Sequence, residues 1–591
     1  MQTSTFYPYA RMIAVLACVS AISTFAPHIF AFFADGHESE LELTFFSIAT
    51  IFSLSFAIFY LAKSTPIPNF VVAIFFGIAA RPFLQPIIDN GVALSSLVGF
   101  GATLILFGGG LETPFGNFKK LLPKILSLSF FGLLLTAVLF SFVSVGLGQA
   151  FHIPLSVTAA VLLGALLAST DPAAIIPILK RLRFKCTDTK DIVVSESAVT
   201  DVTGTLLTVA FLAILSTGAT LGNSVFESYS KIFSPETGIF LLEQLGFGIF
   251  FGVVGYLLLR GFTYLKSSHD REYEVDSAFF LFIPIIIFTL ALAVGGSGYL
   301  AAFIAGLLYS VSDKLHQTER FFNHIIDGFF KPTIFLLLGA LVDLPLLLAY
   351  APLGIAAALI FMFVIRPLSV FVTLWPLSRF GGTMPLSVKD VLFISFVRET
   401  GAIPAVLLVT IAAAGISGIE GLLPVGMWVI LLTLIVEPPL TPWVATKLAV
   451  ADVIPEGEGN LHVTSDSFVV LGSRGRSFPK RLPFVATWAE KHHIDKITLL
   501  LCLENAYRPE SVVEIKAIAQ QSFDAINNDR SRRGLSAIHF SFISHEGLLQ
   551  DSIDELAKGN TDLVAVFVGK KMLDFYLEDV KKLSAPLLFV D

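Results

Sequence analysis

Fourteen apolar runs, each long enough to cross a bilayer, constrain this sequence more than any other feature. A transmembrane helix needs roughly 20 mostly apolar residues. In this chain of 591 residues, 55% are hydrophobic and only 14% are charged, which excludes an ordinary soluble globular protein. The runs span about 11–33, 43–63, 68–85, 92–112, 122–149, 153–180, 190–216, 236–265, 275–294, 297–312, 328–347, 351–376, 388–414 and 421–447. The chain is therefore predicted to be an all-α polytopic membrane protein.

Lysines and arginines between the runs indicate the orientation of the chain. Cytoplasmic loops of membrane proteins carry an excess of these residues. If Arg11 is cytoplasmic, the following basic residues fall on the same side: Lys63, Lys119, Lys120, Lys124, Lys180, Arg181, Arg183, Lys185, Lys190, Arg260, Lys266, Arg271, Lys314, Arg320, Arg379, Lys389 and Lys447. Both termini are therefore predicted to be cytoplasmic, with the protein in the cell membrane, which is the inner membrane in a bacterium.

The first run, 11–33, has two interpretations. It reads as a membrane helix, but a short basic start, an apolar core and Ala34 before a polar stretch also describe a cleaved secretory signal peptide. Cleavage would leave thirteen helices without altering the rest of the map.

A soluble domain follows the membrane segments. The sequence favours a transmembrane domain at 1–447, a linker at 448–462 and a cytoplasmic domain at 463–591. In the cytoplasmic domain, short apolar runs alternate with helical patterns at 512–526 and 572–583, which is typical of a small parallel α/β sheet. The expected strands are 468–471, 497–501, 538–542, 563–568 and 586–590. The outline resembles universal-stress-protein folds, although the glycine-rich motif of their ATP-binding members is not evident.

The turn after the first of these strands, Gly472-Ser473-Arg474-Gly475-Arg476-Ser477, also has two interpretations. Its backbone and arginines could hold a phosphate, with Gly472, Arg474 and Gly475 binding a nucleotide. It could equally be an ordinary strand-to-helix connection, since it lacks a full Walker or dinucleotide-binding pattern. A nucleotide is therefore a candidate effector of a regulatory domain, and no other cofactor is expected.

Two neighbouring predicted membrane helices carry three carboxylates in two short motifs. Asp171 follows Ser169-Thr170 and precedes Pro172, and the next run contains Glu196 and Asp201. An acid at the bilayer centre costs at least ~2.5–3.5 kcal/mol and is by default a functional residue. The proline breaks the helix at that depth, which is tolerated where the freed backbone lines a cavity. These residues predict a site for a small cation.

A second broken helix is predicted in the run 388–414. The polar stretch Arg398-Glu399-Thr400-Gly401 continues to Pro404 in the middle of apolar residues. Counting about 1.5 Å of rise per residue puts Asp171, Asp201, Arg366 and Gly401 near one depth. Five runs from 68 and five from 297 form sets that enter the membrane from opposite sides, with the broken run fourth in each. The sequence thus predicts inverted five-helix repeats with two crossed broken helices.

At this point the chain resembles the monovalent cation:proton antiporters with the sodium/proton exchanger fold, over about residues 45–447. The residues that carry the resemblance are Leu106 to Glu112, Thr170-Asp171-Pro172, Glu196-Ser197 with Asp201, Gly296 to Leu300, Ala305-Gly306, Phe335 to Gly339 and Arg366-Pro367. The order and spacing of these motifs make the resemblance specific. It implies exchange of Na⁺ or K⁺ for protons, and a homodimer.

The resemblance also implies roles for individual residues. Asp201 matches the carboxylate that alternately binds cation and proton, and Thr170, Ser197 and Asp171 would shape the site. Arg366 matches a basic residue that pairs with an acid of the ion-binding helix, which we assign to Glu196. Two departures stand out: Thr200 precedes the key aspartate where many relatives carry Asn or Asp, and in Arg398-Glu399-Thr400-Gly401 the arginine is not beside the glycine.

Several of these residues have purely structural alternatives. Thr170 and Ser197 could simply bond back to helix carbonyls, and Asp171 could only offset the dipoles of the broken helix ends. The Glu196 pair could hold helices in place. Glu399 could be an extra site acid or a partner for Arg398.

The expected mechanism follows from the burial of Asp201. Burial disfavours the charged form of a carboxyl group, so Asp201 can hold either a proton or a cation but not both. If only loaded forms cross, exchange is one to one and electroneutral, which Thr200 favours because it supplies no second charge. A second proton on Glu196 would make the cycle electrogenic.

The alternative function is a ligand-gated K⁺ efflux system or cation channel controlled by the C-terminal domain. The chain is not expected to be an enzyme. Its expected partners are Na⁺ or K⁺, protons and the lipid bilayer, with no nucleic acid and no metal beyond the transported cation.

Overall fold

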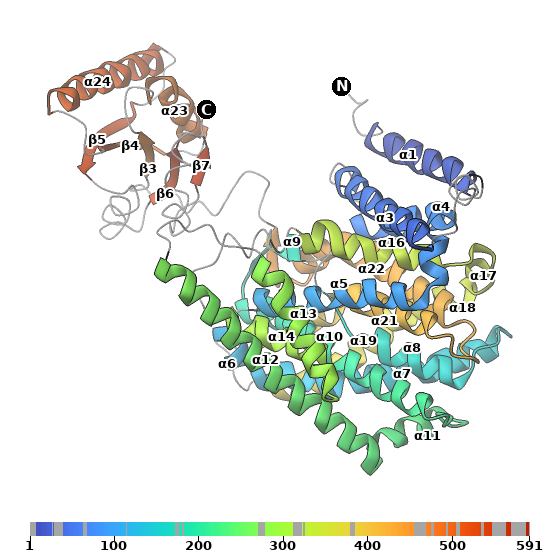
Figure 1. Ribbon diagram of the computed structural model, residues 1–591. Helices are drawn as coiled ribbons and strands as arrows, with labels where there is room; N and C mark the ends of the chain where they lie inside the picture. Colours follow the sequence, from blue (N-terminus) through green and yellow to red (C-terminus); the bar gives the residue numbers. More distant parts are fainter. Residues whose placement is uncertain are drawn as a thin grey trace. The chain divides into compact units, whose positions relative to one another are not determined.

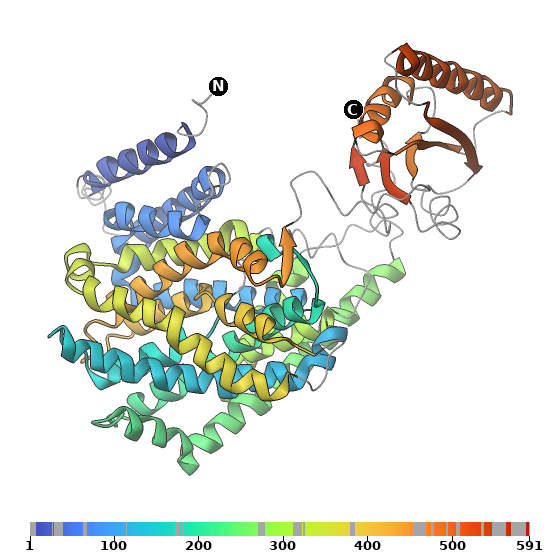
Figure 2. The same cartoon turned by 180° about the vertical axis from the view of Figure 1, so that it is seen from behind.

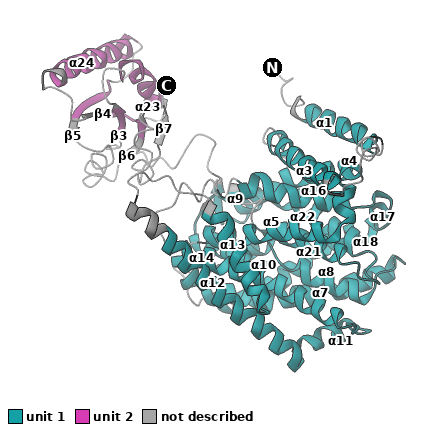
Figure 3. Cartoon of the chain, viewed as in Figure 1, with its two compact units in different colours: residues 1–453 teal, residues 454–591 magenta. Residues whose placement is uncertain are grey.

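In the computed structural model the chain divides into two compact units, residues 1–453 and 454–591 (Figure 3). The structure describes residues 7–26, 28, 40–62, 68–113, 115–171, 176–179, 182–269, 278–310, 322, 325–378, 385–453, 468–473, 478–491, 494–503, 509–532, 537–546, 563–568 and 587–589. The first unit is almost entirely helical, and the second contains a parallel sheet with helices (Figure 1).

The first unit is a bundle of apolar helices, as predicted (Figures 1 and 2). Its α-helices are α1 (Tyr7–Ser23), α3 (Glu40–Ala62), α4 (Asn69–Asp89), α5 (Gly91–Glu112), α6 (Phe115–Leu126), α7 (Leu133–Ala150), α8 (Val157–Leu167), α9 (Ile176–Leu179), α10 (Thr187–Ser216), α11 (Val225–Ser230), α12 (Pro235–His269), α13 (Ala278–Ala293), α14 (Gly298–Tyr309), α16 (Lys331–Leu341), α17 (Leu344–Ala349), α18 (Ala351–Ile360), α19 (Arg366–Leu374), α20 (Val388–Phe396), α21 (Ala402–Ala413) and α22 (Leu422–Lys447). Among the described residues, eight helical segments are long and apolar enough to cross a membrane. Each of the fourteen predicted runs contains a helix, which confirms a multi-pass membrane protein.

Two sets of five elements pack against each other reciprocally. The first set is α4, α5, α6 with α7, α8 with α9, and α10, and the second is α14, α16, α18 with α19, α20 with α21, and α22. The first element of each set packs on the second of the other, since α4 contacts α16 and α5 contacts α14. The third element of each set contains a π-helix, η1 (Ser127–Gly132) or η5 (Phe361–Ile365). This exchange of partners is the pattern of the predicted inverted repeat.

Glycines bring the paired helices into backbone contact. A Cβ atom added to Gly77 of α4 would lie 2.0 Å from the Leu336 carbonyl oxygen of α16, and one at Gly339 would lie 2.1 Å from that of Ile74. The α5–α14 pair repeats this arrangement, because a Cβ at Gly110 or Gly306 would lie 2.3 or 2.2 Å from a carbonyl oxygen of the opposite helix. Small residues allow such close approach between membrane helices. The four glycines thus allow close packing of the α4–α16 and α5–α14 pairs, and α5 and α16 both contact α21 of the second broken element.

The second unit contains a five-stranded sheet in the order β5-β4-β3-β6-β7, with every neighbouring pair parallel. Its strands are β3 (Phe468–Ser473), β4 (Lys496–Leu503), β5 (His539–Glu546), β6 (Leu563–Val568) and β7 (Leu587–Phe589), and its helices are α23 (Leu482–Lys491) and α24 (Pro509–Arg532). All five predicted strands are present, and α24 confirms the helical pattern at 512–526. The helix predicted at 572–583 lies outside the described residues.

One short sheet in the first unit was not predicted. Strand β2 (Ala451–Val453) pairs antiparallel with β1 (Leu182–Phe184), and the Lys185 N–H donates to the Val450 carbonyl at 3.0 Å. These three residues fall within the predicted linker at 448–462, which therefore begins with a strand that pairs with the first unit. The pairing ties the end of the membrane bundle to the segment that follows the first broken helix.

Candidate functional site

Two helices break inside the bundle, and their breaks contact each other. Helix α8 ends at Leu167, while α20 ends at Phe396 and α21 begins at Ala402. The Asp171 N–H donates to the Glu399 carbonyl at 3.0 Å, and the Asp171 Oδ2 accepts from the Ala402 N–H at 2.9 Å. The predicted crossing is therefore present. Pro172, the predicted cause of the first break, lies outside the described residues.

Gly401 makes this crossing sterically feasible. A Cβ atom at position 401 would lie 2.0 Å from the Asp171 Cβ and 2.3 Å from its Oδ2, closer than real Cβ contacts. Pro404 follows within the first turn of α21, where its missing N–H is tolerated. Both predicted helix-breaking residues thus stand at the second break.

Replacing Gly401 with alanine is expected to push the two breaks apart and to abolish the hydrogen bond between Asp171 and the start of α21. The added methyl group would clash with the buried Asp171 carboxylate. We therefore expect Gly401→Ala to lose most transport and to have a lower melting temperature in detergent. Gly116→Ala is a matched control, since a Cβ there meets nothing within 4 Å. If Gly401→Ala behaves like Gly116→Ala, the close approach is not required.

Charged side chains neutralise the partial charges of the helix ends at the crossing. The N-terminus of a helix carries partial positive charge and the C-terminus partial negative charge. The Asp171 carboxylate meets the N-terminus of α21. At the C-terminus of α8, the Arg366 Nη2 donates to the Leu167 and Ser169 carbonyls, both at 3.4 Å, and to the Thr400 Oγ1 at 3.2 Å. Arg366 also stacks over the Phe361 ring, 4.3 Å from its centroid.

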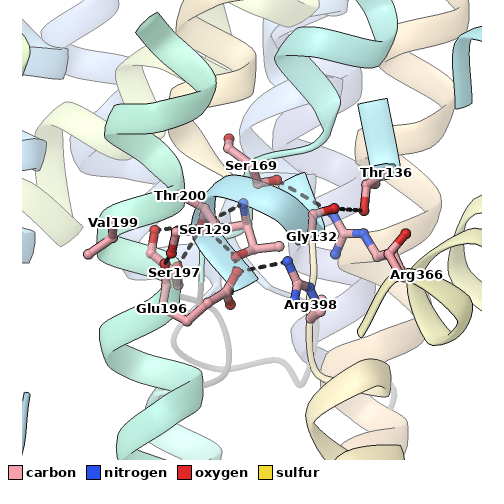
Figure 4. Close-up of polar contacts among 12 residues, drawn as sticks. Ser129, Gly132, Thr136, Ser169, Glu196, Ser197, Val199, Thr200, Arg366 and Arg398 are labelled. Carbon is pink, nitrogen blue, oxygen red and sulfur yellow. Dashed lines mark hydrogen bonds and ion pairs between the residues drawn. The ribbon is translucent and has the colours of Figure 1, made fainter. Parts of the chain in front are cut away.

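Glu196 pairs with a different arginine from the one expected. The Arg398 Nη2 lies 2.7 Å from the Glu196 Oε1, and both side chains are buried (Figure 4). The expected pair of Glu196 with Arg366 is therefore wrong, because the carbonyls at the end of α8 draw the Arg366 guanidinium away. Figure 4 shows Arg366 directed toward Ser169. The pair joins α10 to the second break.

Hydroxyl groups attach the first break to α10. The Ser197 Oγ donates to the Thr170 carbonyl at 2.6 Å, and the Thr170 and Thr200 hydroxyls lie 3.0 Å apart. Thr200 Oγ1 donates to the Ser197 carbonyl at 2.8 Å and lies 3.4 Å from the Thr170 N–H (Figure 4). Thr200 thus has a structural role that was not predicted: it helps to hold the unwound segment.

A small cavity lies beside the crossing and contains Asp201. Its volume is about 40 Å³, and ~10–15 Å³ suffices for one water. Asp171 and Ser197 also line it, whereas Thr170 does not. Asp201 is 6% exposed, and its Oδ1 has no hydrogen-bond partner among the described residues. A buried carboxylate oxygen without a donor in a cavity of this size can accept a proton or a partly dehydrated cation.

Glu399 lies within the second break, and its carboxylate makes no ion pair with Arg398, which pairs with Glu196. Both its carboxylate oxygens are buried and have no hydrogen-bond partner among the described residues. Glu437 of α22 faces the same stretch and accepts from the backbone N–H of Arg398. One turn earlier on α22, the Thr433 Oγ1 accepts from the Thr400 N–H at 3.3 Å. Helix α22 therefore supports the second break as α10 supports the first.

Sequence reasoning missed two ionisable residues of this region, Lys331 and Glu437. Lys331 lines the cavity with Asp171 and Asp201. Each residue stands within a predicted membrane run, Lys331 just before Pro332 and Glu437 just before Pro438. The criterion that identified the three acids, an ionisable residue inside an apolar run, also applies to both.

The fold and site together define a class. Inverted five-element repeats whose fourth elements break and cross beside buried carboxylates are the architecture of a secondary ion transporter. The family model described as sodium/hydrogen exchanger, transmembrane, matches residues 48–447. The chain belongs to this family.

Individual relatives agree with this assignment. The chain is 28% identical over 363 residues to the K(+)/H(+) antiporter NhaP2 of Shewanella oneidensis, covering 60% of this chain and 58% of that protein. It is 27% identical over 364 residues to Na(+)/H(+) antiporter 1 of Methanocaldococcus jannaschii, covering 59% and 79%. The match thus spans well under two thirds of the Shewanella relative. The solved structure of the sodium proton antiporter MjNhaP1 at pH 8 shares the fold, with a TM-score of 0.55 and 24% identity over 69% of this chain and 99% of that one.

Proposed function

We propose that this protein exchanges a monovalent cation, Na⁺ or K⁺, for protons by alternating access, with Asp201 carrying each in turn. The observation that carries the proposal is the Asp201 Oδ1 in the cavity beside the crossed breaks, which has no hydrogen-bond partner in the described part of the chain. The family, and relatives named as K⁺/H⁺ and Na⁺/H⁺ antiporters, support it. Asp171 and Ser197 line the same cavity.

The exchange is electroneutral in this proposal. Thr200 carries no charge beside Asp201, so one proton replaces one monovalent cation. Glu196 is occupied by Arg398 at 2.7 Å, which argues against its taking a second transported proton. A one-to-one cycle moves no net charge.

Reconstituted vesicles with an internal pH-sensitive dye test the function. Addition of Na⁺, K⁺ or Li⁺ should move protons in the opposite direction, and the cation series also identifies the substrate. Electrical recording on the same vesicles separates exchange from a channel. Current that scales with voltage, without proton counterflow, would instead support the ligand-gated K⁺ efflux system or cation channel.

The protein is proposed to be a homodimer with both termini in the cytoplasm. The basic loops support the orientation, and the resemblance to cation:proton antiporters supports the dimer. Light scattering of the purified protein measures whether it is a dimer. Accessibility of tags at each terminus in sealed cells measures the orientation of the termini. A monodisperse monomer, or a terminus labelled from outside, would contradict the corresponding statement.

The C-terminal unit is proposed to regulate transport, with a nucleotide as candidate effector. Doubly wound parallel sheets bind ligands at the carboxyl ends of strands where the strand order reverses. Here that point lies between β3, which ends at Ser473, and β6. Gly472 lies in β3, whereas Arg474 and Gly475 lie outside the described residues. The β1–β2 pairing offers a link from the chain leading to this unit to the first broken helix.

Deletion of residues 460–591 is expected to change the pH or nucleotide dependence of exchange while leaving exchange itself intact, because the cavity belongs to the first unit. The deletion leaves β2 in place. Dye assays over a pH series, with and without ATP, measure the effect. An unchanged profile under all conditions would contradict regulation by this unit.

A further inference from the structure

The Lys331 side chain places a positively charged ammonium group beside the proposed cation site. Lys331 is the first residue of α16, directly after the π-helix η4 (Ile326–Phe330), and its side chain is 9% exposed. It lines the same cavity as Asp171 and Asp201. The proposed exchange cycle gives this lysine no role, yet a buried ammonium group beside a cation site acts on every cation that approaches.

Asp327 holds this lysine. The Lys331 Nζ lies 2.8 Å from the Asp327 Oδ1, one helical turn earlier, and Asp327 is the exposed member of the pair. Asp327 also lines the cavity, as does Glu112 at the end of α5. Basic loops at 119–124, 180–190 and 314–320 adjoin the segments that carry these residues, so the pair lies toward the predicted cytoplasmic end of the cavity.

The Lys331 ammonium resembles the transported ion chemically. Both carry a single positive charge and bind carboxylate oxygens, and the ammonium has three donors on a flexible chain. When Asp327 neutralises it, the lysine repels a cation at Asp201 only weakly. When it is released, it can approach the carboxylates of the cavity, since opposite charges attract strongly in a poorly hydrated site.

We propose that Lys331 is a tethered competitor of the transported cation and that Asp327 restrains it, so that this pair sets the apparent cation affinity. The inference rests on the proposed exchange function. It makes Lys331 a residue that tunes affinity, and Asp201 remains the group that binds.

Two single substitutions should therefore shift the half-maximal cation concentration in opposite directions. Lys331→Gln removes the competitor and should lower this concentration about ten-fold, and Asp327→Asn releases the competitor and should raise it about ten-fold. In the dye assay at fixed pH, both shifts should appear for the cation that wild type transports. Lys231→Gln is the control, because the Lys231 Nζ donates to the Thr220 carbonyl and does not line the cavity. It should leave the half-maximal cation concentration unchanged.

The double variant separates competition from simple attraction. If Lys331 competes, Asp327→Asn should have no effect once Lys331→Gln is present. An equal effect of Asp327→Asn in both backgrounds would show that Asp327 attracts the cation directly, and it would overturn the inference. Unchanged half-maximal concentrations in both single variants would overturn it as well.

Failure of the inference and failure of the function give different results. No exchange by wild type would contradict the proposed function, whereas exchange by wild type with unshifted variants would contradict only the role of Lys331. Elution as a single monodisperse peak confirms that each variant is folded. Should Lys331→Gln not fold, an unshifted half-maximal concentration in Asp327→Asn would still overturn the inference, because that substitution changes a side chain that is 54% exposed.

Discussion

Replacing Asp201 with asparagine is expected to abolish cation-driven proton movement. The amide keeps the shape of the side chain but cannot be ionised near neutral pH, so it neither releases a proton to an arriving cation nor supplies the negative charge that binds it. Because the Asp201 Oδ1 has no partner among the residues that the structure describes, the substitution breaks none of the observed hydrogen bonds at that atom. The dye assay should show signal at the level of empty vesicles, with normal yield and elution of the variant.

Asp191→Asn on the same helix is the matched control. Asp191 does not line the cavity, and its Oδ2 accepts from the Asn117 Nδ2 at 2.8 Å. The same chemical change, ten residues away, should leave exchange largely intact. Robust exchange by Asp201→Asn, at a rate like that of Asp191→Asn, would remove Asp201 from the centre of the mechanism.

Replacing Arg398 with glutamine is expected to be the most destabilising single change in the bundle. It leaves the Glu196 carboxylate buried without its partner, and breaking a buried ion pair on one side costs ~3–5 kcal/mol. The pair is 2.7 Å long, and both side chains are almost fully buried. Thermal unfolding in detergent, followed by fluorescence or by loss of the monodisperse peak, should show a marked decrease in melting temperature.

Glu196→Gln should rescue this variant. With both charges gone, no uncompensated charge remains inside the bundle, so the double variant should recover most of the lost stability. The same substitution should not rescue Arg366→Gln, because Arg366 contacts the α8 carbonyls and Thr400. Rescue of Arg366→Gln, but not of Arg398→Gln, would restore the pairing expected from sequence.

Much of the fold could be predicted because lipid imposes simple rules. The lengths of the apolar runs predicted the helices, and the basic loops predicted on which side of the membrane successive helices begin. The prolines and the glycine near residues 171 and 401 predicted both helix breaks. The prediction of inverted repeats succeeded because each break interrupts the fourth element of its set. The strand β2 was missed, since a three-residue strand has no periodicity to detect.

Pairing within the site was harder to predict, for a physical reason. Residue counting gives depth through the rise per residue, but it does not give the direction in which a side chain leaves its helix or the tilt of the neighbouring helix. Arg366 was placed at the correct level and contacts the first break, yet it turns toward carbonyls and leaves Glu196 to Arg398. Lys331 and Glu437 were not predicted as site residues, although Lys331 stands near the start of the run 328–347 and Glu437 in the interior of the run 421–447.

The chemistry at Asp201 can be measured without a membrane. If Asp201 holds either a proton or a cation, adding Na⁺ or K⁺ to the purified protein in weakly buffered detergent should release protons into solution. We expect one proton per cation bound for wild type and none for Asp201→Asn. Cation binding by wild type without proton release, or equal release by Asp201→Asn, would contradict exchange at this carboxylate.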